Sequence, residues 1–184
     1  MILGVVGSGR EPSNSGRLVE EVIAGAREAG AGETRTVSLA RLSFRGCVGC
    51  GACRATATRC VLEDDLTPVL HETRTCRGLV LATPIYYGYA TGLFKSYLDR
   101  WYSFRDAGRA LRVPTGRPAV LLVTQGHPDP DAYAWTLGSL ERVLTSYGFD
   151  PTALVAPGLE EAGAVDRHPD LLARARDLGR ALGA

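Results

Sequence analysis

The hydrophobic positions of the chain form short continuous runs that alternate with longer, helically spaced stripes. The runs are residues 2–6, 34–39, 79–83, 119–124 and 152–155. The first, third and fourth are apolar almost throughout, which is typical of parallel strands covered on both faces. Apolar residues three or four positions apart mark helices within 18–26, 93–101, 137–147 and 171–182. The alternation predicts a doubly wound α/β fold with a five-stranded parallel sheet.

Length and element order indicate one domain. A chain of 184 residues has the usual length of a single domain, and the sequence contains no internal repeat and no interdomain linker. We therefore expect one α/β domain over residues 1–184. The one sizeable irregular stretch is an insertion at about 43–65, between the second and third strands, and it holds four of the five cysteines.

Charge and hydrophobicity exclude several classes of partner. The net charge of +1 gives no electrostatic footprint for nucleic acid or an acidic membrane. No apolar run approaches the ~20 residues that span a bilayer, and the N-terminus lacks the features of a signal peptide. We expect a cytoplasmic protein with no membrane or nucleic-acid partner. Because disulfides are rare in a reducing compartment, the clustered cysteines favour metal or redox chemistry.

Three loops are the candidate ligand sites. In a doubly wound sheet, ligands bind beyond the carboxyl ends of the strands, which here means residues 7–15, 83–92 and 124–131. The first loop has the composition of a phosphate site, because glycines let the backbone approach an anion and the following helix offers unpaired N–H groups and a positive dipole end. Its polar residues are Ser8, Arg10, Ser13, Asn14 and Ser15. The alternative is an ordinary serine-capped helix behind a tight turn.

Rival motifs fail at this loop. A dinucleotide fingerprint G-x-G-x-x-G requires glycine where Pro12 stands, and an NTP-binding loop requires lysine where Arg10 follows Gly9. A serine hydrolase is disfavoured because its G-x-S-x-G motif requires glycine two residues before Ser8, where Val6 stands.

The loop after the third strand suits a flat apolar ligand. We expect Pro84 to end the strand and Gly88 to permit a close backbone approach. Tyr86, Tyr87 and Tyr89 offer aromatic faces beside backbone amides, as a planar heteroaromatic ring requires. The alternative is a tyrosine-rich interface loop.

Both loops resemble those of a known family. Residues 7–15 look like the phosphate loop of NADPH-dependent FMN reductases, and 83–88 followed by 93–100 resembles that superfamily's ring-binding loop and next helix. The resemblance covers roughly residues 1–156. It implies a flavodoxin-like three-layer sandwich with strand order 2-1-3-4-5, an FMN cofactor, and NAD(P)H as co-substrate.

The resemblance also assigns residues. It implies phosphate contacts from Ser8, Arg10, Asn14 and Ser15, and the composition of the loop adds Ser13 as a small donor. It implies that the isoalloxazine ring lies against Pro84, Ile85, Tyr86, Tyr87 and Gly88, and that a third wall follows the fourth strand at Thr124, Gln125 and Gly126. His127 could touch the flavin edge or lie on the surface. Lys95 and Asp99, four residues apart on a helix, are expected to form a local pair.

The insertion contains a compact cysteine motif. Cys47, Cys50, Cys53 and Cys60 follow the pattern C-x2-C-x2-C-x6-C, and closely spaced thiolates can converge on a soft metal centre. The motif resembles that of iron–sulfur flavoproteins, a branch of the same superfamily with a [4Fe–4S] cluster. The alternatives are a loop of free or oxidised thiols and a zinc site. Cys76, at the start of the third strand, is expected to be a small buried residue.

These observations predict an FMN-dependent NAD(P)H oxidoreductase that reduces a small-molecule acceptor. Acceptors of this class include quinones, azo or nitro compounds, flavins and biosynthetic intermediates. The alternatives are a non-enzymatic electron carrier linked to ferredoxin, and a thiol- or metal-sensing module. The resemblance also implies a homodimer or homotetramer, and we expect its interface to use the aromatic stretch 97–104, with adjacent Trp101 and Tyr102 exposed. The alternative is that Trp101 and Tyr102 simply cap the core.

Overall fold

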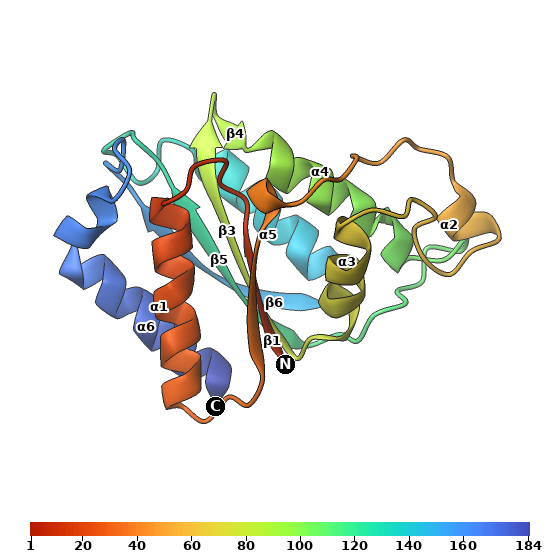
Figure 1. The fold of residues 1–184 in the computed structure, drawn as a ribbon, viewed down its shortest axis with the longest axis horizontal. Helices are drawn as coiled ribbons and strands as arrows, with labels where there is room; N and C mark the ends of the chain where they lie inside the picture. Colours follow the sequence, from red (N-terminus) through yellow and green to blue (C-terminus); the bar gives the residue numbers. More distant parts are fainter.

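A twisted parallel sheet lies between two layers of helices in the computed structural model, which describes residues 1–184 (Figure 1). Its five parallel strands are β1 (Ile2–Val6), β2 (Thr34–Ser38), β3 (Gly78–Tyr86), β5 (Arg117–Thr124) and β6 (Phe149–Ala156). They follow the order β2-β1-β3-β5-β6. Counting only these five, the order is the predicted 2-1-3-4-5. The labels differ because a short strand that the sequence did not predict, β4 (Tyr89–Ala90), pairs antiparallel with the end of β3.

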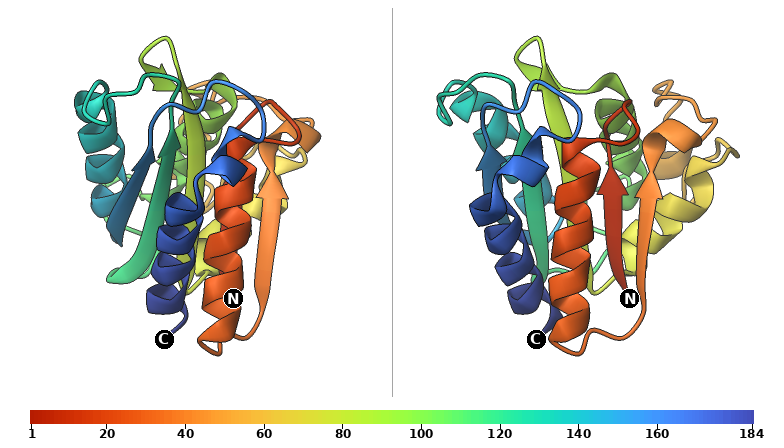
Figure 2. Two further views of the ribbon diagram at one scale, coloured as in Figure 1. Left: turned by 90° about the vertical axis from the view of Figure 1, so that its left-hand side faces the viewer. Right: turned by 60° about the vertical axis from the view of Figure 1, so that its left-hand side comes forward.

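Helices cover both faces of the sheet (Figure 2). Helices α1 (Asn14–Glu28) and α6 (Pro169–Gly183) lie on one face, and α3 (Leu66–Thr75), α4 (Gly92–Arg100) and α5 (Ala134–Ser146) lie on the other. The short elements are α2 (Ala52–Ala55) and the 3-10 turns η1 (Leu39–Arg41), η2 (Trp101–Phe104) and η3 (Ala164–Arg167). The fold is therefore the predicted flavodoxin-like three-layer sandwich.

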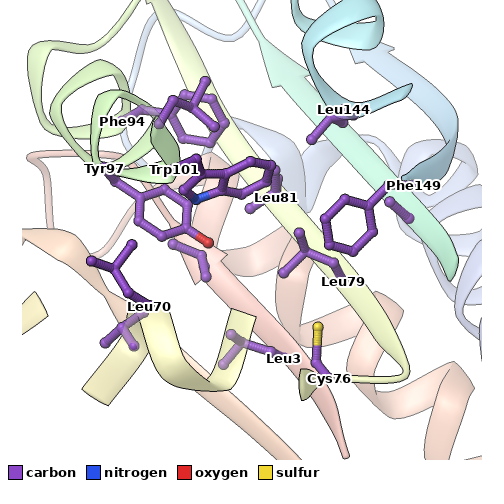
Figure 3. Packing of buried hydrophobic residues seen from close by; sticks show 14 of the residues in the cluster. Leu3, Leu70, Cys76, Leu79, Leu81, Phe94, Tyr97, Trp101, Leu144 and Phe149 are labelled. Carbon is purple, nitrogen blue, oxygen red and sulfur yellow. The ribbon is translucent and has the colours of Figure 1, made fainter. Parts of the chain in front are cut away.

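The alternation of side chains along the strands divides the core in two. Leu79 and Leu81 of β3 face α3, α4 and α5, whereas Val80 and Ala82 face α1 and α6. Both sets are buried, which explains why the strand reads as a continuous apolar run. The first core is rich in aromatic rings (Figure 3).

Trp101 lies inside that aromatic core. Its ring is fully buried and stacks on Phe104 with the centroids 5.5 Å apart. The expectation that Trp101 and Tyr102 together form an exposed aromatic surface is therefore wrong for Trp101, which fills the space between α4 and the sheet. Tyr102 is 42% exposed.

The strand β3 does not end at Pro84 as expected. It continues to Tyr86, and Pro84 pairs in register with Thr124 of β5. Backbone groups along a strand alternate in direction, so the nitrogen of Pro84 faces the same side as Ala82, where β1 has already ended at Val6. The missing N–H therefore interrupts no ladder between strands.

The backbones of helices α1 and α6 approach each other closely at glycine positions. A Cβ atom added to Gly179 would come within 2.0 Å of the carbonyl oxygen of Val22, and one added to Gly25 within 2.0 Å of that of Arg176. These glycines let the two backbones touch and hold α6 against α1. No helix is both long enough and apolar enough to span a membrane.

Candidate functional site

Four loops meet in an open pocket of about 250 Å³ at the carboxyl edge of the sheet. The lining residues are Ser8, Arg10, Ser13, Asn14, Ser15, Pro84, Ile85, Tyr86, Thr124, Gln125, Gly126, Leu159, Glu160 and Ala162. The structure thus brings together all the residues predicted for a cofactor except Tyr87 and Gly88. The loop after β6 supplies Leu159, Glu160 and Ala162, which the sequence analysis missed.

The first loop presents unpaired backbone donors to the pocket. The side chain of Ser13 caps helix α1 by accepting a hydrogen bond from the N–H of Gly16 (3.0 Å). The N–H groups of Gly9 and Ser13 have no acceptor in the chain, and those of Asn14 and Ser15 lie in the first helical turn, where no helical acceptor exists. Such a row of N–H groups at the positive end of a helix dipole fits a phosphate dianion.

Arg10 lies at the rim of this loop. Its Nη1 donates to the carbonyl oxygen of Glu160 (2.9 Å), which ties the first loop to the loop after β6. It forms no ion pair with a carboxylate, and the residue is exposed and lines the same pocket as Ser13, Asn14 and Ser15. The charge of Arg10 is therefore available to an anion in the pocket.

Asn14 has a structural use that the sequence did not reveal. Its Nδ2 donates to the carbonyl oxygen of Glu161 (2.8 Å), and its Oδ1 accepts from the N–H of Val165 (3.1 Å). The side chain is thus committed to holding the loop after β6, and only the backbone N–H of Asn14 is left for a ligand. No local signal could have shown this, because both partners lie about 150 residues further along the chain.

The third-strand loop forms a β-hairpin that projects beyond the sheet (Figure 1). Its two central residues, Tyr87 and Gly88, have positive φ angles of 50° and 82°, as a type I′ turn requires. Tyr87 is fully exposed at the tip, while Pro84, Ile85 and Tyr86 line the pocket. The hairpin therefore offers the pocket a proline, a backbone segment and one tyrosine ring.

The start of helix α4 fixes this hairpin to the first loop. The hydroxyl of Thr91 donates to the carbonyl oxygen of Gly7 (2.5 Å), and the N–H of Thr91 donates to the hydroxyl of Thr83 (3.2 Å). All three residues lie at the base of the pocket loops. The phosphate side and the hairpin side therefore have a fixed mutual position.

The third wall is rigid as well. The side chain of Gln125 is buried and donates to the carbonyl oxygens of Asp129 (2.6 Å) and His127 (3.2 Å). His127 turns its Nδ1 to the N–H of Asp129 (3.1 Å) and does not line the pocket. Lys95 and Asp99 form the expected local ion pair on α4 (2.6 Å) and take no part in the pocket.

The four cysteines of the insertion are all free thiols. Cys47 and Cys50 are exposed, Cys60 is half-buried and Cys53 is buried. Burial, followed by the charges of Cys60, Cys47 and Cys50, raises the pKa of Cys53, so each of the other three thiols lies within electrostatic reach of Cys53. No three of them are gathered closely enough to hold a metal ion in this arrangement. As expected, Cys76 is buried, and it lies at the end of α3.

Arginines surround the insertion. Arg112 donates to the carbonyl oxygen of Cys53 (2.7 Å) and Arg74 to that of Thr58 (3.1 Å), and neither pairs with a carboxylate. Burial and the nearby charge of Arg112 lower the pKa of Arg74. This uncompensated positive charge fits a centre built from thiolates, which carry negative charge. In donor type and in surrounding charge, the loop therefore suits an iron–sulfur cluster. In this arrangement, however, its four sulfur atoms do not converge on one point.

The strand order and the polar pocket at the carboxyl edge define a flavodoxin-like α/β protein. The chain superposes on an NAD(P)H:quinone oxidoreductase from Methanothermobacter marburgensis with a TM-score of 0.73 at 21% identity, covering 100% of this chain and 96% of that one. It superposes on an FMN-dependent NADH-azoreductase from Bacillus anthracis, solved in complex with FMN, with a TM-score of 0.72 at 11% identity, covering 100% and 99%. At such identities the likeness shows the fold alone.

The sequence identifies the family. Residues 1–144 match the family described as NADPH-dependent FMN reductase, and the chain belongs to it. Similar curated proteins include an iron–sulfur flavoprotein from Methanosarcina thermophila, 31% identical over 115 residues (62% of this chain, 59% of that protein). Another, from Archaeoglobus fulgidus, is 28% identical over 151 residues (81% and 64%). A third relative, an iron–sulfur flavoprotein from Methanocaldococcus jannaschii, is matched over 50% of its length. The chain therefore spans about half to two thirds of the length of these relatives.

Proposed function

We propose that the protein is an FMN-dependent oxidoreductase that takes electrons from NAD(P)H and passes them to a small-molecule acceptor. The observation that carries the proposal is the pocket in which the phosphate-type loop, the proline–tyrosine hairpin and the wall after β5 meet. Its unpaired N–H groups and Arg10 fit a phosphate, and its hairpin offers a flat ring both an aromatic face and backbone polar groups.

The residues of the pocket have separate roles in this proposal. FMN, when bound, supplies the hydride chemistry, and the protein supplies binding and orientation. The start of α1 and Arg10 hold the phosphate. Pro84, Ile85 and Tyr86 position the ring, with Thr124, Gln125 and Gly126 on its other side. Tyr87 and Gly88, at the tip of the hairpin, would contact the ring only from outside the pocket described above.

The test is spectroscopic. Purified protein should show flavin absorbance, or acquire it with FMN, and mixing with NADPH or NADH should bleach it. Protein that remains colourless with added FMN would overturn the proposal. Bleaching by reduced ferredoxin alone would support the alternative of an electron carrier. Quinones, azo compounds, nitro compounds and free flavin are then compared as acceptors by the rate at which each reoxidises the protein.

A second candidate function adds an iron–sulfur centre. The observation that favours it is the set of four free cysteines among arginines that lack carboxylate partners; the names of the curated relatives agree with it. Cys47, Cys50, Cys53 and Cys60 would hold a [4Fe–4S] cluster, which exchanges electrons singly whereas NAD(P)H delivers them in pairs. Because thiolates oxidise in air, the protein is purified anaerobically and assayed for iron and acid-labile sulfide. About four of each per chain, lost together in Cys50→Ser, would support it.

The same proposal includes self-association in the cytoplasm. Three aromatic residues are exposed near the hairpin: Tyr87 at its tip, Tyr89 and Trp135. The rings of Tyr89 and Trp135 pack edge to face, with their centroids 4.8 Å apart. Exposed aromatic residues beside a pocket favour contact with a second copy of the chain. Light scattering at micromolar concentration should give the mass of a dimer or tetramer, and a monomer mass would reject this part.

A further inference from the structure

A single buried arginine holds both ends of the cysteine loop, defined here as residues 46–63. Arg100 is the last residue of α4, and its side chain is 0% exposed. Its Nη1 donates to the carbonyl oxygen of Arg45 (2.9 Å), just before the loop, and its Nη2 donates to that of Leu62 (2.9 Å), near the end of the loop. The guanidinium thus bridges two backbone segments that lie at opposite ends of the loop.

Asp64 completes this junction. Its carboxylate accepts hydrogen bonds from Arg100 (2.9 Å), from the N–H of Arg45 (3.1 Å) and from the N–H of Leu66 (3.2 Å) at the start of α3. The loop is therefore closed at its base by one buried ion pair that also contacts both of its ends. Lysine could not replace this arrangement, because a single ammonium cannot reproduce the planar fork of a guanidinium.

One donor of Arg100 is left over. Its Nε is buried and has no hydrogen-bond acceptor, which is a costly state for a charged group. The two outer nitrogens of Arg100 are thus committed to the backbone and to Asp64, whereas Nε is left without a partner.

We propose that Arg100 is a positioning residue for the cysteine loop: by holding both ends of the loop at one point, it limits how far the four thiols must move to gather around a soft metal centre. The proposal deepens the second candidate function, because it concerns the same cysteines. It also gives α4 two roles, since the start of the helix fixes the pocket loops through Thr91 and its last residue fixes the cysteine loop.

The test compares Arg100→Lys with a matched control, Arg117→Lys. Arg117 is another buried arginine that donates to backbone carbonyls, those of Thr73 and Cys76, and also has an unpartnered nitrogen, but none of its acceptors belongs to the cysteine loop. The full chain is purified anaerobically, reduced, stripped of iron and titrated with Co²⁺, which gives a thiolate-to-cobalt charge-transfer absorption. Hydrogen exchange of residues 46–63 is measured on the same samples.

The expected result is specific to Arg100. Arg100→Lys should weaken Co²⁺ binding by about 10–100-fold, as loss of an outer-shell partner does, and speed exchange within 46–63 by roughly tenfold or more. Arg117→Lys should leave both near wild type. Equal effects of the two variants, an unchanged Arg100→Lys, or wild-type protein that captures no Co²⁺ would overturn the proposal.

A second variant covers the case in which Arg100→Lys does not fold. Asp64→Asn keeps the side-chain shape and removes the charge, so it should weaken Co²⁺ binding by a smaller factor, and no change in Co²⁺ binding or exchange would overturn the proposal. Two further measurements, flavin absorbance and iron–sulfur reconstitution, test the proposed functions separately from the role of Arg100. Colourless protein, or protein that takes Co²⁺ but no iron–sulfur cluster, would contradict those functions and leave the role of Arg100 intact.

Discussion

The hydroxyl groups of Ser15, on helix α1, and Thr124, at the end of β5, share a hydrogen bond of 2.9 Å. Both side chains are buried, and they join two pocket loops that are far apart in the sequence. The bond fixes the start of α1 against the third wall. The phosphate-type loop is therefore set in position by the protein itself, which lowers the ordering cost of binding a ligand.

Arg10→Ala should weaken FMN binding. The variant removes the one cation at the rim of the first loop and its bond to the carbonyl oxygen of Glu160. A lost charge-assisted hydrogen bond costs about 1.5–3 kcal/mol, or about 10- to 150-fold in Kd. The measurement is quenching of FMN fluorescence, with Arg27→Ala, at the far end of α1, as the control. Equal Kd values for wild type and Arg10→Ala would show that the phosphate does not lie beside Arg10.

The stability of the protein should fall in acid because of Glu21. Burial by itself would raise the pKa of this carboxyl, but hydrogen bonds and charges from Arg176 and Arg17 outweigh it and lower the pKa from its ordinary value of 4.5. Since the folded pKa lies below the unfolded one, the contribution is complete above that ordinary value of 4.5 and is lost as pH falls through the folded value.

Glu21→Gln tests this contribution. At pH 7 the variant should lose about 1.5–3 kcal/mol of unfolding free energy, and the difference from wild type should shrink as pH falls from about 5 to about 3. Urea denaturation at several pH values measures it. A difference that stays constant over this range would mean that the charge of Glu21 contributes nothing.

Cys76 should resist alkylation in the native protein. Burial raises the pKa of its thiol to about 11, so almost none is thiolate at pH ~8, and its side chain is also inaccessible. Cys47 and Cys50 are exposed and should react with iodoacetamide within the same period. Mass spectrometry before and after unfolding measures the extent of alkylation at each cysteine. Labelling of Cys76 at the rate of Cys47 would indicate that the end of α3 opens readily.

Gly179→Ala should destabilise the fold. The new Cβ atom would lie 2.0 Å from the carbonyl oxygen of Val22, so α1 and α6 would have to separate. Overpacking of this kind costs about 1–3 kcal/mol, which lowers Tm by roughly 2–4 °C per kcal/mol in a chain of this size. Gly32→Ala is the control, because its Cβ atom would meet nothing within 4 Å. If Gly179→Ala and Gly32→Ala had the same Tm, the close packing of α1 against α6 would be contradicted.

The sequence predicted those parts of the fold and the site that depend on local pattern. The five parallel strands are visible as apolar runs. The pocket loops after β1 and β3 are visible as the glycine, serine and tyrosine residues that follow two of these runs. The continuation of β3 past Pro84 could not be foreseen, because it depends on where the neighbouring strand ends. The commitment of Asn14 depends on contacts with residues 161 and 165. Leu159 and Glu160, by contrast, follow the last strand, and the rule for carboxyl ends could have included them.

Tyr87→Asn should weaken self-association of the protein without lowering its folding stability. Tyr87 has a φ of 50° and is fully exposed, and a bulky residue with positive φ is unfavourable, whereas Asn before Gly is preferred in a type I′ turn. The variant should therefore be as stable as wild type or up to about 1 kcal/mol more stable. A tyrosine kept at such a position against its backbone preference is expected to serve a contact outside its own chain. Light scattering should accordingly show weaker self-association in the variant, while a loss of thermal stability in monomeric protein would instead place the ring of Tyr87 against its own hairpin.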